Sequence, residues 1–250
     1  MNSFRADLHV HTVLSPCGDL KMSPAAIVET AARRGIDILG ITDHNSTKHG
    51  PLVSKLAREK GIFVLCGAEV TTREEAHCLT FFENFETLAA FQQYLDRHLP
   101  DIKNDPKYFG YQVVLDEQEM IVEEEERLLI SGLDQGLDQV ETEVHRLGGL
   151  FIPAHIDRPR YSLTSQLGFV PQDLKADALE VSRFTTPEEM IRQFPWIESY
   201  TFIRSSDAHH PDTLGSGITI FDMENRNFGE IRKALHKQDN RSTRIEKPGI

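Results

Sequence analysis

Apolar runs and amphipathic stretches alternate along most of this sequence. Runs such as ILGITDH (38–44), IFVLCGAEV (62–70) and GGLFIPAH (148–155) are short and mostly apolar, as buried strands are. Before the last run lies a segment whose apolar side chains recur every third or fourth position. They are Leu133, Leu137, Val140, Val144 and Leu147. That period predicts a helix. Because strands that alternate with helices are typically parallel, the pattern predicts an α/β fold, either a barrel or an open sheet.

Capping residues mark the ends of several predicted helices. Ser23 precedes Pro24, and Gly35 follows the last periodic residue, so one helix is predicted between them. Thr186 and Glu189 have the spacing of a capping box, which predicts the start of another. Further helices are predicted at 51–61, 86–99 and 228–237.

Two segments depart from this alternation. Residues 101–130 contain the charged stretches DEQEM and EEEER, and we expect them to form a surface insertion. The insertion is expected to be a hairpin, or a loop that covers the functional site as a lid. Residues 238–250, QDNRSTRIEKPGI, are expected to form an exposed tail. With no repeat or low-complexity linker in the sequence, we expect a single domain over residues 1–250.

Composition and charge narrow the function classes. The chain is 39% hydrophobic and 26% charged, which is ordinary for a globular protein. The sequence contains no long apolar run, its first residues lack the pattern expected of a signal peptide, and the three cysteines lack CxxC spacing, so we expect a cytoplasmic protein that does not bind a membrane. The net charge is −12 without a block of Lys and Arg, from which we expect no duplex nucleic acid partner. A small anionic substrate is compatible with this charge, since bound cations reverse the local field.

Imidazoles and carboxylates lie at the ends of the apolar runs. His9 and His11 stand two residues apart in a predicted strand, so both face the same side. Asp207 and His209 repeat this spacing in SSDAH. The remaining members of the set are Asp19, His44, Glu69, His77 and His155. Since the carboxyl ends of parallel strands form the active face of such folds, we expect the nine side chains to converge on one pit.

Two interpretations account for paired imidazoles on one strand face: a shared metal ion, or hydrogen-bond donors. A lone histidine such as His155 is more often hydrogen-bonded than ligated. Six imidazoles and three carboxylates at the ends of successive runs favour metal, and they exceed what one mononuclear site uses. We therefore expect two to three divalent ions. Nitrogen and oxygen ligands suit Zn²⁺, Mn²⁺ or Fe without choosing among them, and Cys17 is a further thiolate candidate.

The stretches DLHVHTVLSPCGD, GITDHN, GAEV, IPAH and SSDAH resemble the motifs of the PHP (polymerase and histidinol phosphatase) family of metal-dependent phosphoesterases. The resemblance runs from residue 6 to about residue 210. It implies a distorted (β/α)7 TIM-like barrel with its metal site at the carboxyl ends of the strands. It also implies three ion sites, whose ligands are His9, His11, Glu69 and Asp207 for the first, Glu69, His77 and His155 for the second, and Asp19, His44 and His209 for the third.

The expected reaction is hydrolysis of a phosphoester by a metal-activated hydroxide. The expected substrate is small and phosphorylated: a nucleotide, a sugar phosphate, a histidinol-phosphate-like metabolite or the end of a short oligonucleotide. Asp207, His209 or a bound water is expected to protonate the leaving group. Cationic candidates for substrate binding are Arg158, Arg183, Lys48 and His210, each with a surface salt bridge or a supporting role as the alternative.

Two other functions are compatible with the same motifs. An amidohydrolase-type hydrolase shares the HxH pair and the late aspartate, but the sequence offers no mid-chain lysine at a strand end as a bridging ligand. A non-catalytic metal-binding module is expected to show a broken ligand set, whereas all nine positions here hold competent ligands.

Overall fold

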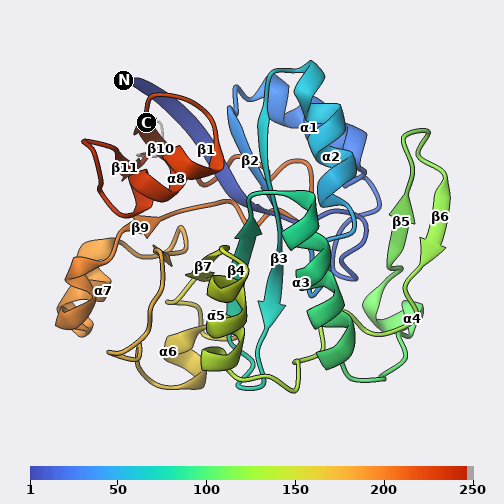
Figure 1. Ribbon diagram of the computed structural model, residues 1–250. Helices are drawn as coiled ribbons and strands as arrows, with labels where there is room; N and C mark the ends of the chain where they lie inside the picture. Colours follow the sequence, from blue (N-terminus) through green and yellow to red (C-terminus); the bar gives the residue numbers. More distant parts are fainter. Residues whose placement is uncertain (247–250) are drawn as a thin grey trace.

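The computed structural model describes residues 1–246, and its centre is a curled seven-stranded sheet (Figure 1). The strand order is β11-β10-β1-β2-β3-β4-β7. The strands are β1 (Asn2–Val10), β2 (Ile38–Ile41), β3 (Phe63–Thr71), β4 (His77–Phe82), β5 (Val113–Leu115), β6 (Ile121–Glu124), β7 (Leu150–Pro153), β8 (Leu179–Glu180), β9 (Phe202–Ile203), β10 (Thr219–Met223) and β11 (Ser242–Ile245). The helices are α1 (Pro24–Arg33), α2 (Gly50–Glu59), α3 (Phe85–His98), α4 (Pro106–Phe109), α5 (Leu137–Arg146), α6 (Leu163–Gln166), α7 (Pro187–Gln193), the 3-10 helix η1 (Pro195–Ser199) and α8 (Phe228–Leu235). The α/β class predicted from the sequence is confirmed.

Strand direction differs from the expectation of a parallel sheet. β1, β2 and β3 are parallel, but β4 runs antiparallel to both β3 and β7, and β10 runs antiparallel to β1. The reversal places the start of β4, at His77, beside the end of β3, where Thr71 is its register partner. The ends of β1, β2, β3 and β7 and the beginning of β4 therefore lie at the same edge of the sheet.

The short strands β8 and β9 lie between β7 and β1. They pair with each other in parallel. The amide of Asp177 donates to the carbonyl of Phe151 on β7 (2.9 Å), and Val10 of β1 forms an isolated parallel bridge with Ala208. The segments that follow β8 and β9, which carry Ser182 and Asp207, are thereby brought to the same edge as the end of β1. The expected number of seven β/α units stays a prediction.

Two apolar clusters form the core. One contains Leu8, Leu65, Phe81 and Ile152 from the strands, closed by α8. The other lies between the sheet and the helices, where α2 packs on β3, α3 on β4 and α5 on β7. The pairing of β1 with β2 contains a register shift between Asp7 and Val10. A bulge of this kind interrupts the strict alternation of side chains along a strand. Leu8 packs in the interior cluster, and the next residue, His9, lies at the end of the strand where the other strand ends meet.

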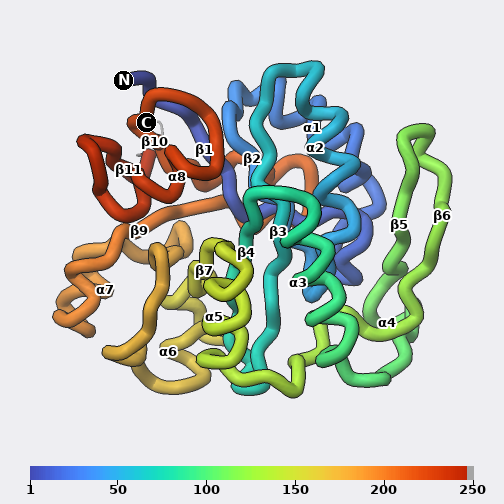
Figure 2. The backbone as a smooth tube through the Cα atoms, in the orientation of Figure 1, coloured from blue at the N-terminus to red at the C-terminus, as the bar shows by residue number. Residues whose placement is uncertain are grey.

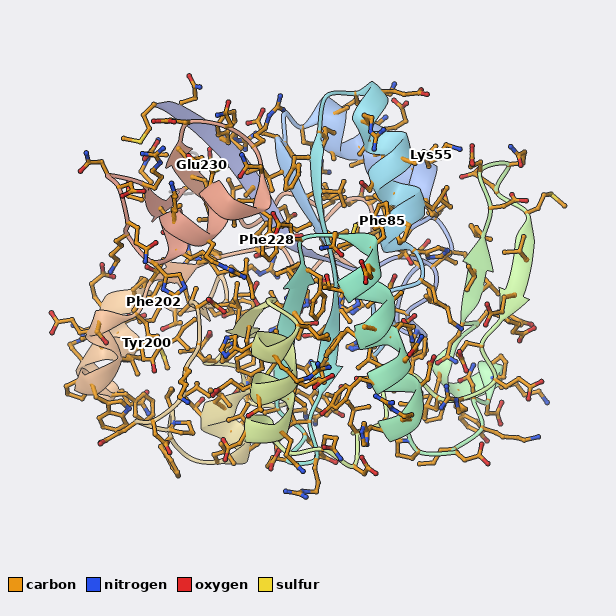
Figure 3. All side chains as sticks on the ribbon, in the orientation of Figure 1. Lys55, Phe85, Tyr200, Phe202, Phe228 and Glu230 are labelled. Carbon is orange, nitrogen blue, oxygen red and sulfur yellow. The ribbon has the colours of Figure 1, made fainter. Side chains whose placement is uncertain are left out.

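Residues 101–130 contain α4 and the β5–β6 hairpin, which stands at the side of the molecule (Figure 2). Lysines of the neighbouring segment hold the hairpin. Lys48 lies 2.5 Å from Glu123 and 2.8 Å from Glu125. Lys55 of α2, labelled in Figure 3, pairs with Glu117.

The expected tail is partly structured. β11 pairs antiparallel with β10, so Ser242–Ile245 form an edge strand and not a free tail, although Ser242 and Arg244 are exposed as expected. Residues 247–250 lie outside the described part of the chain. Among the helices of residues 1–246, none has both the length and the apolarity to cross a bilayer.

Candidate metal centre

Six imidazoles and two carboxylates meet at the shared edge of the strands. They are His9, His11, His44, Glu69, His77, His155, Asp207 and His209. Glu69 lies at their centre with 1% of its side chain exposed, and five imidazoles have a nitrogen within 3.2 Å of its oxygens. The structure therefore brings together eight of the nine residues expected from the sequence.

The first group of possible ligands consists of His9, His11, Glu69 and Asp207. The Nε2 atoms of His9 and His11 lie 3.2 Å apart. Each lies 3.2 Å from an oxygen of Glu69, and 3.3 Å and 3.4 Å respectively from Oδ1 of Asp207. Two nitrogens and two carboxylates thus face one small volume, which is the donor set that divalent transition metals use.

Two further groups share members with the first. His44, Glu69 and His77 form one, with His77 Nδ1 at 2.9 Å and His44 Nδ1 at 3.2 Å from Glu69. His11, His44 and His209 form the other. His155 is near the first of these two, since its Nε2 lies 3.1 Å from Oε1 of Glu69. The groupings differ in detail from the sets that the family resemblance implies, and the assignment of ligands to ions stays a proposal.

Asp19 lies away from these groups. Its carboxylate accepts a hydrogen bond from the amide of Lys21 (2.7 Å) and lies 3.6 Å from Nε2 of His210. Only its backbone amide reaches the site, donating to the carbonyl of His209 (2.8 Å). Asp19 is on a loop, where the alternation that fixes side-chain direction in a strand does not apply.

Buried charges set the protonation of the centre. Burial would raise the pKa of Glu69, but the imidazoles of His77, His9 and His44 hold it well below its usual range. Burial would lower the pKa of His11, yet the adjacent carboxylates of Asp207 and Glu69 raise it to about 9. The pKa of His44 is lowered by burial, and that of His209 falls to about 4 through burial and the nearby His11. The carboxylate of Glu69 is therefore ionised and the imidazoles of His44 and His209 are neutral, which are the forms that bind metal. His9 and His11, whose pKa values are raised by the adjacent carboxylates, would release a proton when a cation binds.

A second layer of side chains orients the imidazoles. Oε2 of Glu180 accepts from Nδ1 of His9 (3.0 Å), which leaves Nε2 facing Glu69. Nδ1 of His11 is 2.9 Å from the hydroxyl of Ser15, and that hydroxyl donates to Asp43 (2.6 Å). Glu180 was not among the predicted site residues, although DALEVSR follows the same rule of a carboxylate at the end of an apolar run.

Unpaired atoms test whether the site suits metal ions. Among the buried side-chain atoms of the described residues, Nδ1 of His44 and Oδ1 of Asp207 have no contact with the geometry of a hydrogen bond, although Nδ1 lies 3.2 Å from Glu69 and Oδ1 lies 3.3 Å and 3.4 Å from His9 and His11. Leaving such groups unpaired costs about 1–3 kcal/mol each, and a divalent cation satisfies both. His155 and Asp207 also adopt left-handed backbone conformations, with φ of 28° and 51°. Strain of this kind is concentrated at functional sites. The residues fit a metal centre.

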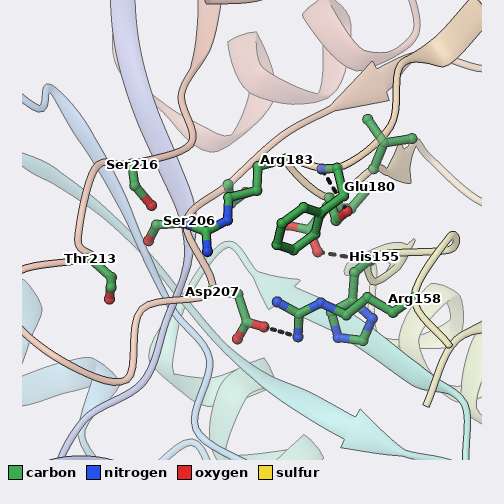
Figure 4. Close-up of a pocket in the computed structure, with 12 residues that line it drawn as sticks. His155, Arg158, Glu180, Arg183, Ser206, Asp207, Thr213 and Ser216 are labelled. Carbon is green, nitrogen blue, oxygen red and sulfur yellow. Dashed lines mark hydrogen bonds and ion pairs between the residues drawn. The ribbon is translucent and has the colours of Figure 1, made fainter. Parts of the chain in front are cut away.

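The predicted substrate-binding cations fall in different places. Arg158 lies beside the metal centre and contacts Asp207 (Figure 4). Arg183 borders a cavity next to the metal centre. Lys48 is instead paired with Glu123 and Glu125 of the hairpin, and His210 lies on the outer side next to Asp19.

Three exposed residues at the rim were not found from the sequence. Arg160 and Tyr161 border a cavity that has Glu69 in its wall, named here the cavity above Glu69. Phe184 borders the neighbouring cavity, which Arg183 also borders. The ring of Tyr161 is stacked on His77 with 4.9 Å between the ring centres. The proximity of RPRY to the predicted His155 was the available signal for Arg160 and Tyr161.

The model of the PHP domain matches residues 7–177, and a PHP-associated model matches residues 199–240. This chain belongs to the PHP family. The resemblance noted in the motifs is thereby confirmed. Protein YqxK of Bacillus subtilis (strain 168) is 26% identical over 272 residues, covering 96% of this chain and 64% of YqxK. This PHP chain therefore spans slightly less than two thirds of that relative.

Solved structures share the fold. The lesion-specific endonuclease PfuEndoQ from Pyrococcus furiosus is 20% identical with a TM-score of 0.70, over 97% of this chain and 58% of that one. An endonuclease Q complex with a 27-mer duplex substrate, with an abasic lesion at the active site, has 21% identity and a TM-score of 0.71, over 96% of this chain and 58% of that one.

The second of these structures corrects one expectation. The acidic net charge led us to exclude duplex nucleic acid, but this same fold is seen with a duplex at the active site of endonuclease Q. Net charge was the wrong criterion, because binding depends on the local field at the site, where Arg158, Arg160 and Arg183 border the cavities.

Proposed function

We propose that this chain hydrolyses phosphoesters with the help of divalent metal ions held by its histidine and carboxylate cluster. The observation that carries the proposal is the arrangement around Glu69, where three overlapping groups of ligands surround one buried carboxylate. Ions bound there would act as Lewis acids toward phosphate oxygens and lower the pKa of water. Overlapping groups favour two to three ions over one, with Glu69 shared between them.

The chain's own residues have separable roles in this proposal. Glu69 and Asp207 supply the negative charge that holds the cations, and the imidazoles complete their coordination. Arg158, in contact with Asp207 and 38% exposed, faces both the cavity above Glu69 and the one beside it, so it orients the phosphate through its fork of N–H donors.

Two groups are placed to move the proton of the leaving oxygen. Asp207 and His209 both border the cavity above Glu69, and the side chain of His209 is more exposed, at 31% against 8%. We assign the contact with the leaving group to His209, since an incoming substrate reaches it first, and the proton itself to a water held beside it, because the lowered pKa of His209 leaves the imidazole neutral. Asp207 then serves mainly as a ligand.

The rim favours an organic phosphoester over free phosphate. Tyr161 and Phe184 are 45% and 75% exposed, and each lies next to an arginine at the edge of a cavity. Exposed aromatic rings beside cations bind the rings of nucleotides by stacking and cation–π contacts. A nucleotide, or the end of an oligonucleotide, is the substrate class that this rim suits best.

The test is hydrolysis by protein loaded separately with Mn²⁺, Zn²⁺ and Fe²⁺, followed as phosphate release for the monoesters and as strand cleavage on a gel for the diester. The substrates are a mononucleotide, a short oligonucleotide with a terminal phosphate, an internal diester and p-nitrophenyl phosphate. Asp207→Ala is the inactive control and Asp173→Ala, on an exposed loop, is the matched control. We expect metal-dependent release that Asp207→Ala abolishes and Asp173→Ala retains.

The same samples separate the alternatives. Metal binding with no cleavage of any phosphoester would overturn the proposal and leave the non-catalytic module or an amidohydrolase-type hydrolase. Hydrolysis of an amide or lactone panel then distinguishes these two. Cleavage of the internal diester but not of the terminal phosphates would place the activity with nucleases.

A further inference from the structure

Within the described residues, the strands of the β5–β6 hairpin pair only with each other, and the hairpin stands at the side of the molecule (Figure 2). A two-stranded hairpin is marginally stable by itself, so its position depends on what it contacts. Its ion pairs with Lys48 and Lys55 are partly exposed, and such pairs contribute little. A further contact is buried: the amide of Leu115 on β5 donates to Nε2 of His49 (2.9 Å), whose side chain is 0% exposed. His49 is therefore a buried anchor of the hairpin.

The hydrogen bonds of His49 fix its tautomer. Burial lowers the pKa of His49, which keeps the ring neutral. Because Nε2 accepts the amide hydrogen of Leu115, the single proton of the neutral ring is on Nδ1. Nδ1 lies 2.6 Å from Oγ1 of Thr12 and donates to it. That hydroxyl also accepts from the amide of Leu14 (3.1 Å), and its own hydrogen goes to Oδ2 of Asp43 (2.8 Å). The Thr12 hydroxyl thus uses its one hydrogen and both of its lone pairs.

From Asp43 the hydrogen bonds continue to two of the proposed metal ligands. Oδ1 of Asp43 accepts from the hydroxyl of Ser15 (2.6 Å). That hydroxyl in turn accepts from Nδ1 of His11 (2.9 Å) and from the backbone amide of His44 (3.2 Å). Nε2, on the other side of the His11 ring, lies 3.2 Å from Glu69. A continuous chain of hydrogen bonds therefore joins the backbone of the hairpin to the metal centre.

This chain of hydrogen bonds is buried and saturated. No side chain in it is more than 1% exposed, so water does not replace a missing partner. Neither hydroxyl has a free hydrogen or lone pair, so neither can rotate to absorb a displacement of its neighbour. Moving Leu115 away would leave Nε2 of His49 buried without a donor, which is costly. A change in the position of the hairpin is therefore transmitted to His11.

We propose that the β5–β6 hairpin is coupled to the metal centre through His49, so that a bound divalent ion and the docked hairpin stabilise each other. His49 is a positioning residue, which acts on the ligand His11 through Thr12, Asp43 and Ser15. The inference rests on the metal centre of the function proposed above and adds a means of regulating it. Whatever holds the hairpin in place tightens metal binding, and whatever displaces the hairpin weakens it, because coupling between two sites is reciprocal.

The first experiment measures amide hydrogen exchange by mass spectrometry in chelator-treated protein, before and after addition of Mn²⁺, Zn²⁺ or Fe²⁺. We expect each ion that binds to slow exchange in peptides from the hairpin by about fivefold or more, the lower end of typical coupling between sites. In His49→Asn the side-chain amide still donates to Thr12 but offers Leu115 no acceptor in place of Nε2. The effect of the ion on the hairpin should therefore vanish, and the metal affinity measured by isothermal titration should fall by a comparable factor.

Two controls separate coupling from a general loosening of the protein. Lys55→Ala removes an exposed ion pair to the same hairpin and should keep the slowing by the ion. The segment that follows the hairpin is an internal reference, since the side-chain amide of Asn45 donates to the carbonyls of Leu129 (2.7 Å) and Ser131 (2.8 Å). Its exchange should be alike in the parent protein and in His49→Asn.

A measurement on the parent protein alone does not depend on the folding of any variant. Long-range ¹H–¹⁵N NMR of the metal-free protein should show the proton of the His49 ring on Nδ1. A proton on Nε2 would mean that the ring cannot accept from Leu115, and this result would overturn the proposal.

The outcomes distinguish failure of the coupling from failure of the proposed function. Ion binding that leaves hairpin exchange unchanged in the parent protein, or that slows it equally in His49→Asn, overturns the coupling whatever the protein hydrolyses. Slowing that His49→Asn abolishes, in a protein that cleaves no phosphoester, supports the coupling and overturns the hydrolytic function. If none of the three ions binds, the metal centre is wrong and the coupling is overturned with it.

Discussion

Glu180 lies behind His9, with its Oε2 3.0 Å from Nδ1 of the imidazole, while Nε2 on the other side of the ring lies 3.2 Å from Glu69. Burial would raise the pKa of Glu180, but His9 opposite it lowers that pKa below its usual value. An ionised carboxylate in this position fixes the tautomer of His9 and makes its Nε2 a better ligand. Glu180 is thus a positioning residue for the proposed centre.

Glu180→Gln should weaken metal binding without unfolding the protein. The amide keeps the shape but loses the charge that fixes His9, and changes of this kind typically reduce metal affinity by about 10- to 100-fold. Isothermal titration of metal into chelator-treated protein measures the loss. Glu141→Gln is the matched control, since Glu141 is also buried, at 8% exposed against 2% for Glu180, and accepts a backbone hydrogen bond from Lys175 (3.0 Å), but lies on α5. Parent affinity in Glu180→Gln would contradict the assignment.

Arg158→Ala should raise KM for phosphorylated substrates and leave metal content unchanged. Arg158 contacts Asp207 and borders both cavities, so its loss removes a charge-assisted contact worth about 1.5–3 kcal/mol, or roughly 10- to 100-fold in KM. Steady-state kinetics and metal analysis of the same preparation check both parts. Arg192→Ala, 75% exposed on α7, is the control and should behave as the parent protein. Unchanged KM in Arg158→Ala would remove it from the substrate site.

The sequence allowed good prediction where side-chain direction follows from strand geometry. His9 and His11 share a face because they are two residues apart near the end of one strand, and Glu69 and His155 follow from the rule that strand ends converge. Asp19 could not be placed in this way, because a loop has no fixed alternation and its carboxylate turned to the amide of Lys21. Glu180 was predictable by the same rule as Glu69 but was not recognised.

Long-range pairing was the other limit. The antiparallel direction of β4 depends on the tight turn at residues 72–76. The apolar runs on either side of that turn look the same in the sequence as two parallel strands joined by a crossover, so the sequence did not reveal the direction of β4. Lys48 follows a ligand-bearing strand end and was therefore expected to bind substrate. Its partners Glu123 and Glu125 lie in the charged stretch EEEER, far along the chain, and only the fold shows that they meet.

Lys48→Ala should loosen the hairpin and leave catalysis nearly unchanged. With its ammonium held by Glu123 and Glu125, Lys48 is not free to contact a phosphate. Partly exposed ion pairs contribute about 0–1 kcal/mol, so the global stability should change little. Limited proteolysis should nevertheless cut faster between β5 and β6, because transient opening exposes that segment. A large rise in KM, with unchanged cleavage at the hairpin, would return Lys48 to the substrate site.

Asp177 gives a pH-dependent prediction that does not involve the metal centre. It is 8% exposed and accepts from the amide of Phe151 (2.7 Å), with His145 at 3.2 Å and His236 at 2.8 Å. Burial would raise its pKa, but His145, the amide of Phe151 and His236 lower it below its usual value. A carboxyl group whose pKa is lower in the folded protein stabilises the fold above its unfolded pKa of about 3.9, and this contribution is lost as the pH falls through the folded value.

Asp177→Asn should therefore lower the free energy of unfolding near neutral pH by about 1–3 kcal/mol, the cost of breaking hydrogen bonds to a charged group. The difference from the parent protein should begin to shrink below about pH 4, where the carboxyl of the unfolded chain becomes neutral, and it should be lost as the pH falls through the lower pKa of the folded protein. Urea unfolding at about pH 7 and about pH 3, with chelator present throughout, measures it. Asp173→Asn, in the same loop but exposed, should match the parent at both values. A difference that stays constant down to the lower pH would show that Asp177 contributes through its shape and not its charge.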